Sequence, residues 1–149
     1  MILVDANLLL YAYNPRAQEH EKSRIWLEGV LSGTDLVRFA WLTLWAFLRI
    51  ATNSRVFERP LSTSEAEAAV SSWLAQPSAG ILEPGERHWD VLQGLMRQGQ
   101  TAGPLVMDAV IAAIALEHGA LVCTTDRDFS RFPGLKWTNP LVVGRLHDR

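Results

Sequence analysis

The chain has 149 residues, of which 48% are hydrophobic and 20% are charged, so it has the size and composition of one domain with a buried core, not of a disordered segment. Its 14 basic and 16 acidic residues give a net charge of -2, which excludes binding of nucleic acid by bulk positive charge but leaves room for a local basic groove. The single cysteine, Cys123, excludes a disulfide framework and a thiolate zinc site, and it fits a reducing, cytoplasmic location.

We expect no membrane span. The longest uncharged apolar run, 109–116, is far shorter than the ~20 residues that a spanning helix needs.

Short apolar runs alternate along the chain with longer segments of helical periodicity. The first run, Ile2–Val4, is apolar on both faces, which is typical of a strand buried in a parallel sheet. A capping box, Ser62-Thr-Ser-Glu65, marks the start of one helix, and Gly119 closes another. In chain order we expect a strand at 2–4, helices at 7–13 and 20–31, a strand at 36–40, helices at 41–51 and from 62 to about 75, a strand at 80–82, helices at 86–98 and 105–118, and strands at 120–123 and 136–137.

This alternation predicts a three-layer α/β/α domain with a central, mainly parallel sheet of four or five short strands. We expect residues 1–149 to form a single domain, with the last ~9 residues as a tail. Sheets of this kind bind their ligands beyond the carboxyl ends of the strands. The residues directly after the strands at 2–4 and 120–123 are therefore the first candidates for chemistry.

Three aspartates stand out at these positions. Asp5 directly follows the first strand, and Asp126 follows the strand 120–123 after two threonines. Asp108 is the only charged residue between Leu105 and Leu116, in the first turn of a strongly apolar helix. If the two strands are parallel neighbours, Asp5 and Asp126 lie at the same edge of the sheet.

Each aspartate also has an ordinary structural explanation. Asp5 and Asp126 suit helix or turn N-caps, Asp108 suits the positive end of a helix dipole, and Asp128 suits a solvated turn. An ionised carboxylate in an apolar helix is nevertheless costly unless an arginine, a hydrogen-bond network or a cation compensates it. Several carboxylates together favour a cation, and hard oxygen ligands favour Mg²⁺ or Mn²⁺. Taken together, the aspartates predict a divalent-metal site that can polarise a phosphoryl group.

The order and spacing of these residues resemble the PIN-domain nucleases, and more closely the VapC toxins of VapBC toxin–antitoxin pairs. The resemblance rests on Asp5-Ala-Asn7, on Asp108 at the start of an apolar helix, and on Thr124-Thr-Asp-Arg-Asp-Phe129 after a strand. The segments Phe47–Asn53 and Phe132–Leu135 are similar to a subgroup abundant in mycobacteria and other actinobacteria. Each motif is short, but the likeness runs from Ile2 to about Pro140.

The resemblance implies a Mg²⁺- or Mn²⁺-dependent endoribonuclease acting on tRNA or rRNA, with a VapB-type antitoxin and a homodimeric state. It assigns the catalytic and metal-binding positions to Asp5, Asp108 and Asp126, with the ion held mainly by Asp5 and Asp108. The supporting residues that it implies are Asn7 and Thr124. From its place in the turn after Asp126, Asp128 could also reach the site, and we expect it as a further supporting residue.

One position departs from the family. The glutamate that the family usually carries in the helix after the second strand is Ala46 here, and no acidic residue lies between Asp35 and Glu58. Three carboxylates suffice for one octahedral ion completed by water, but they argue against a tightly held second ion. The same loss supports an alternative in which the chain is a weak or inactive PIN scaffold that binds RNA or a protein partner.

Arginine is the expected means of holding RNA, because 12 of the 14 basic residues are arginine and its guanidinium binds phosphate in a bidentate manner. We expect RNA contacts from Arg49, Arg55 and Arg127, although Arg49 also suits an ion pair with a site carboxylate. Arg59 and Arg131 fit better as surface residues that provide solubility or ion pairs.

A different enzyme class, phosphoryl transfer through an aspartyl intermediate, is disfavoured by the residues near Asp5. That chemistry usually uses a second aspartate at position 7 and a nearby lysine, whereas position 7 is Asn7 and the only lysines are Lys22 and Lys136. We expect no adduct with beryllium fluoride.

Overall fold

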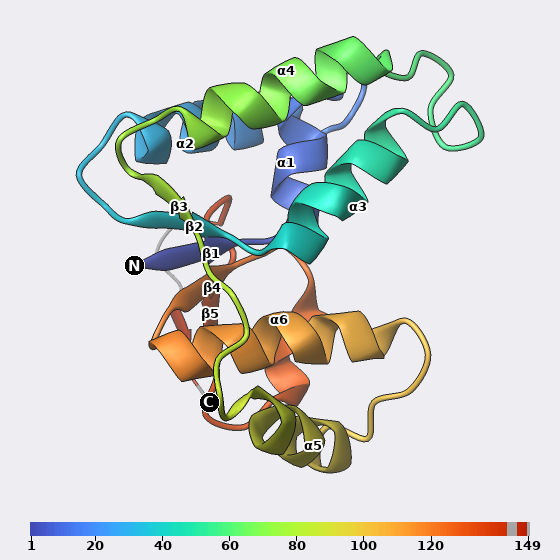
Figure 1. The fold of residues 1–149 in the computed structure, drawn as a ribbon. Coiled ribbons are helices and arrows are strands. Elements are labelled where there is room, and N and C mark those ends of the chain that lie inside the picture. Colours follow the sequence, from blue (N-terminus) through green and yellow to red (C-terminus); the bar gives the residue numbers. More distant parts are fainter. Residues whose placement is uncertain (143–145, 149) are drawn as a thin grey trace.

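Within residues 1–142 and 146–148, which the computed structural model describes, six strands form one sheet in the middle of the molecule (Figure 1). Their order across the sheet is β3-β2-β1-β4-β5-β6. The first five strands pair in parallel, and β6 pairs antiparallel with β5. The strands are β1 (Ile2–Val4), β2 (Val37–Phe39), β3 (Ala79–Ile81), β4 (Leu121–Cys123), β5 (Lys136–Thr138) and β6 (Leu146–Asp148).

Helices cover both faces of the sheet, as Figure 1 shows, with α1 to α4 on one side and α5 and α6 on the other. One apolar cluster lies beneath α1 to α4 and a second joins the sheet to α5 and α6. The helices are α1 (Ala6–Ala12), α2 (His20–Leu31), α3 (Trp41–Ala51), α4 (Thr63–Leu74), α5 (His88–Gln98) and α6 (Leu105–His118), and a 3-10 helix, η1, spans Arg127–Arg131.

The predicted three-layer α/β/α fold with a mainly parallel sheet is confirmed. The strands expected from the sequence correspond to the five parallel strands, and the antiparallel β6 is an addition that was not predicted. Its three residues, Leu146–Asp148, fall within the expected tail and include no apolar run that would predict a strand. Residues 143–145 and 149 of that tail lie outside the described part of the chain.

Local sequence explains where the helices begin and end. Ser62 accepts a hydrogen bond from the Glu65 backbone and the Glu65 side chain returns one to the Ser62 backbone, which is the predicted capping box at the start of α4. Gly119 ends α6 with a φ of 66°, a left-handed conformation that glycine adopts without strain. Within the described ranges, no helix has the length and apolarity needed to cross a membrane.

The central pair of strands sets the position of the candidate site. Val4 pairs with Cys123 in the parallel register of β1 and β4, so the next residues, Asp5 and Thr124, leave the sheet side by side. The expectation that these two strands are parallel neighbours is confirmed.

Candidate metal centre

Asp5 and Thr124 meet directly where β1 and β4 end. The Asp5 backbone N–H donates to the Cys123 carbonyl at 3.0 Å, and the Thr124 hydroxyl donates to Asp5 Oδ2 at 2.7 Å. Asp5 also acts as the N-cap of α1, because its Oδ1 accepts from the Ala6 backbone N–H at 2.8 Å. The capping explanation of Asp5 is therefore confirmed, and the cap leaves its carboxylate at the carboxyl end of β1, where the functional explanation requires it.

Thr124 is the centre of a small polar network. Its hydroxyl oxygen accepts from Asn7 Nδ2 at 3.3 Å and from the Asp126 backbone N–H at 3.0 Å, while its proton goes to Asp5. Because Thr124 is fully buried, these bonds hold its hydroxyl in one orientation. The structure thus brings the predicted supporting residue Asn7 into contact with Thr124, and Thr124 into contact with Asp5.

The turn after β4 carries the next two carboxylates. Asp126 is the N-cap of η1, and its Oδ1 accepts from the Asp128 backbone N–H at 2.8 Å. Phe129, on the same turn, is fully buried in the core. This anchor keeps Asp126 and Asp128 at the edge of the sheet although Asp128 itself is exposed.

Asp108 reaches the same place from the other layer. It lies half-buried in the first turn of α6, as the sequence predicts. One carboxylate oxygen each from Asp108, Asp126 and Asp128 lie within 4.8 Å of one another, a spacing at which they could hold one metal ion.

Asp5 is not a member of this group of three. The sequence assigns the ion mainly to Asp5 and Asp108, whereas the structure gathers Asp128 with Asp108 and Asp126. Both Asp5 oxygens already accept a hydrogen bond, although each retains a further lone pair. In the sequence, Asp128 is marked by its place two residues after Asp126. The N-cap bond from the Asp128 backbone N–H to Asp126 keeps the two side chains close together.

The carboxylates disfavour one another's ionisation. Burial, followed by the negative charges of Asp126, Asp5 and Asp128, raises the pKa of Asp108 to about 7. Burial also raises the pKa of Asp5, against hydrogen bonds from Thr124 and Ala6 that lower it, and Asp126 contributes a smaller upward effect. A cation at the site would relieve this repulsion.

The described residues supply little positive charge to the group. Within residues 1–142, no arginine, lysine or histidine forms an ion pair with Asp5, Asp108 or Asp126, and Arg131 approaches Asp128 at 3.9 Å. Asp5 and Asp108, whose pKa values are raised, and Asp126 have no ion-pair partner within residues 1–142, and such hard oxygen donors fit a divalent cation.

The predicted RNA-binding arginines lie on the surface. Arg49 is exposed on α3, Arg55 follows that helix, and Arg127 is exposed on η1 directly beside Asp126. The alternative pairing of Arg49 with a site carboxylate is not present in residues 1–142. Ala46 lies on α3, which brings no carboxylate to the site.

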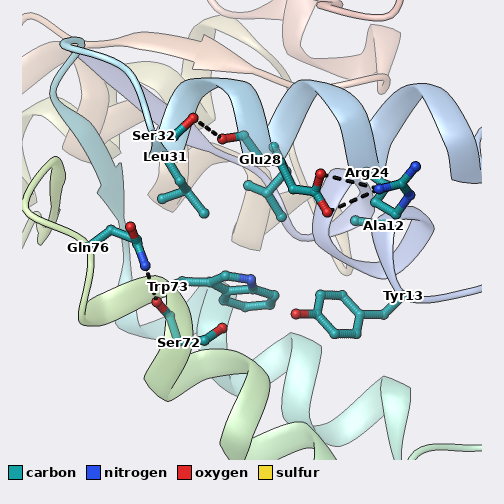
Figure 2. Close-up of a pocket in the computed structure, with 10 residues that line it drawn as sticks. Ala12, Tyr13, Arg24, Glu28, Leu31, Ser32, Ser72, Trp73 and Gln76 are labelled. Atoms are coloured by element: carbon teal, nitrogen blue, oxygen red, sulfur yellow. Dashed lines mark hydrogen bonds and ion pairs between the residues drawn. The ribbon is translucent and has the colours of Figure 1, made fainter.

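A separate pocket lies between α1, α2 and α4, away from the acidic group (Figure 2). It has a volume of about 490 Å³, and its lining includes Tyr13, Leu27 and Trp73. Figure 2 shows the Tyr13 and Trp73 rings side by side in this pocket, with centroids 5.6 Å apart in edge-to-face geometry. None of the carboxylates of the acidic group lines this pocket. The pocket is therefore separate from the candidate metal centre.

Comparison with known proteins shows the family of the chain. The PIN domain family model matches residues 2–135, and Ribonuclease VapC37 of Mycobacterium tuberculosis is 46% identical over 140 residues, covering 94% of this chain and 97% of that protein. This chain belongs to the VapC ribonucleases of the PIN-domain family. The resemblance inferred from the Asp5, Asp108 and Asp126 motifs is thereby confirmed.

Solved structures place this VapC chain in the same fold. VapBC2 from Rickettsia felis, bound to a DNA fragment from its promoter, has a TM-score of 0.66 at 16% identity and covers 93% of this chain and 98% of that one. Mycobacterium tuberculosis VapC20, described as a sarcin-ricin loop cleaving toxin, has a TM-score of 0.63 at 20% identity and covers 87% and 93%. At these identities the likeness establishes the fold.

Proposed function

We propose that this VapC chain is a divalent-metal-dependent endoribonuclease that hydrolyses RNA phosphodiester bonds as the toxin of a toxin–antitoxin pair. The observation that carries the proposal is the meeting of carboxylates from three separate segments without a cationic partner on Asp5, Asp108 or Asp126 in residues 1–142. A structural role alone would be expected to pair these charges.

Asp108, Asp126 and Asp5 are the proposed metal-binding and catalytic residues, and Asp128 supplements them. When bound, Mg²⁺ or Mn²⁺ would supply positive charge at the scissile phosphate and would lower the pKa of water, so that hydroxide is available as the nucleophile near neutral pH. Thr124 holds Asp5 through its hydroxyl, and Asn7 fixes the direction of that hydroxyl. Asp126 completes the surroundings of the ion or orients the attacking water. No side-chain nucleophile is needed.

We assign RNA binding to Arg49, Arg55 and Arg127. All three side chains are exposed, and Arg127 adjoins the acidic group on η1. Selection of one RNA would then come from shape and unpaired loops, which is the common mode of RNA recognition. The naming of VapC20 as a sarcin-ricin loop cleaving toxin favours structured tRNA or rRNA as the substrate class.

We further propose a VapB-type antitoxin as partner, a homodimeric state and a cytoplasmic location. The solved VapBC2 complex of Rickettsia felis supports the antitoxin. The exposed Trp41 and Trp45 on α3, 41% and 62% exposed, offer apolar surface for a protein interface.

Sequencing of RNA 5′ ends after brief expression of the wild type and of Asp5→Asn tests the proposed activity. New 5′ ends at a few sites in tRNA or rRNA are expected with the wild type and not with the variant. Equal sets of ends from both proteins would contradict the assignment of Asp5.

One observation favours a second candidate, an inactive or weak scaffold that binds RNA or a protein. It is Ala46, which stands where the family usually has an acid. Purified protein incubated with cellular RNA and Mn²⁺ or Mg²⁺ separates the two candidates, because the scaffold would retain RNA without shortening it.

A further inference from the structure

Arg131 occupies an unusual place beside the acidic group. It ends η1, the turn that carries Asp126 and Asp128, and its guanidinium reaches across to the segment that precedes α6. Its Nη1 donates to the Gly99 carbonyl at 2.9 Å, and its Nη2 lies 3.9 Å from Asp128 Oδ1. Gly99 is the C-cap of α5 and begins the connection that leads to Asp108.

The side chain is held more firmly than a surface arginine. Its Nε is buried, without a hydrogen-bond partner among the described residues, and the side chain is 32% exposed. The segment that it reaches is also closely packed, because a Cβ on Gly99 would lie 3.2 Å from the Phe132 ring. Phe132 directly follows Arg131 and is fully buried.

We propose that Arg131 is a positioning residue for the metal centre. It fastens the turn that carries Asp126 and Asp128 to the segment that delivers Asp108, and so fixes the separation of these carboxylates. The inference rests on the proposed metal-dependent function and assigns to Arg131 a role that neither the sequence nor the family comparison gives it.

Electrostatics and positioning predict opposite results when Arg131 is changed. Burial dominates the raised pKa of Asp108, and Arg131 is the positive charge that counteracts it. If Arg131 acted only as a charge, its loss would make the acidic group more attractive to a cation, and Mn²⁺ would bind more tightly. If Arg131 holds the carboxylates in place, its loss weakens Mn²⁺ binding, because supporting residues of metal sites contribute about tenfold or more to affinity.

The test measures Mn²⁺ affinity of the full chain by electron paramagnetic resonance of the free ion, for the wild type, Arg131→Gln and Arg131→Lys. The lysine variant keeps the positive charge but lacks the guanidinium, whose two Nη atoms reach the Gly99 carbonyl and Asp128. We expect both variants to bind Mn²⁺ about tenfold more weakly than the wild type. Arg97→Gln, which removes an exposed charge near the end of α5, is the matched control and is expected to bind like the wild type.

Unchanged or tighter Mn²⁺ binding by Arg131→Gln overturns the inference, as does normal binding by Arg131→Lys. A lowered melting temperature in EDTA with normal Mn²⁺ affinity assigns Arg131 a purely structural role and also overturns it. If Arg131→Gln does not fold, Arg131→Lys decides alone. Failure of the wild type to bind Mn²⁺ contradicts the proposed metal dependence itself, and so is distinguishable from failure of the inference alone.

Discussion

Two aspartates of this chain are helix N-caps and also lie at the acidic group, which explains why their sequence context was ambiguous. Asp5 caps α1 and lies beside the acidic group, and Asp126 caps η1 and belongs to that group. The N-cap bond and the place at the acidic group are compatible, because the cap bond directs each carboxylate. A capping aspartate at the carboxyl end of a parallel strand is therefore still a functional candidate.

Asp108 gives a pH-dependent prediction for the protein without metal. Its pKa is raised to about 7 in the folded chain from an ordinary value of 3.8, so its proton stabilises the folded state below about pH 4 and that stabilisation is lost as the pH rises through 7. Asp108→Asn should therefore melt higher than the wild type in EDTA at pH 8, by about 2–6 °C. This corresponds to about 1–2 kcal/mol for a half-buried, partly screened charge.

Differential scanning fluorimetry at pH 5 and pH 8 checks this, and the difference between the two proteins should grow with pH. A lower melting temperature for Asp108→Asn at both values would indicate a structural ion pair instead.

Two substitutions of Thr124 separate the effect of its hydroxyl group from the effect of its side-chain volume. Thr124→Val removes the donor to Asp5 and the acceptor for Asn7 and the Asp126 backbone, which should cost about 1–3 kcal/mol of stability and lower RNA cleavage at least about tenfold. Thr124→Ser keeps the hydroxyl and should retain most activity. Urea denaturation and single-turnover cleavage measure the two effects, and full activity of Thr124→Val would refute the proposed support.

For the helices and strands, short sequence patterns sufficed to predict the bounds wherever the local sequence contains clear start and stop signals. The bounds of β1, α2, α3 and α6 coincide with those predicted, because apolar runs there end at polar turns, glycine or proline. The strand β6 was missed because Leu146–Asp148 has no apolar run and forms by pairing with β5. Its existence depends on a distant partner, which local sequence does not encode.

The arrangement of the candidate site was likewise predictable only where a local sequence pattern determines it. The meeting of Asp5 with Thr124 was predictable, because it needs only two parallel neighbouring strands. Asp128 was predicted as a supporting residue, but its place in the group with Asp108 and Asp126 in preference to Asp5 was not predictable, and neither was the reach of Arg131 to Gly99. These features depend on how η1 packs against the segment before α6, and an arginine in a polar turn has no sequence signature that distinguishes a bridging role from solubility.

The capping box of α4 provides a test that stability and activity are separable. Ser62→Ala removes the side chain that accepts from the Glu65 backbone and should lower the free energy of unfolding by about 1 kcal/mol. Because α4 contributes none of the site's carboxylates, RNA cleavage below the melting temperature should not change. Circular dichroism during urea denaturation measures the stability, and a large loss of cleavage would show that α4 is coupled to the site.

At the scale of the whole molecule, the site is a junction of the two halves. Asp5 belongs to the layer of α1 to α4, and Asp108 belongs to the opposite layer, with the sheet between them (Figure 1). A cation that binds the junction should therefore stabilise the complete fold and not one segment.

Mn²⁺ should raise the melting temperature of the wild type in a concentration-dependent manner, and EDTA should reverse the rise. At one hundred times its Kd the ion would add about 2.7 kcal/mol. Thermal denaturation over a Mn²⁺ series measures this effect. Asp126→Asn is the matched variant, expected to lose most of the response, and an equal response in both proteins would show that Mn²⁺ binds elsewhere.

The most direct measurement is an anomalous difference map from crystals of the wild type grown with Mn²⁺. We expect one strong peak at ~2.0–2.4 Å from carboxylate oxygens of Asp108 and Asp126, with Asp128 or Asp5 completing the protein ligands. A map without a peak at these residues, or with each carboxylate paired to its own arginine, would contradict a metal centre at this edge of the sheet.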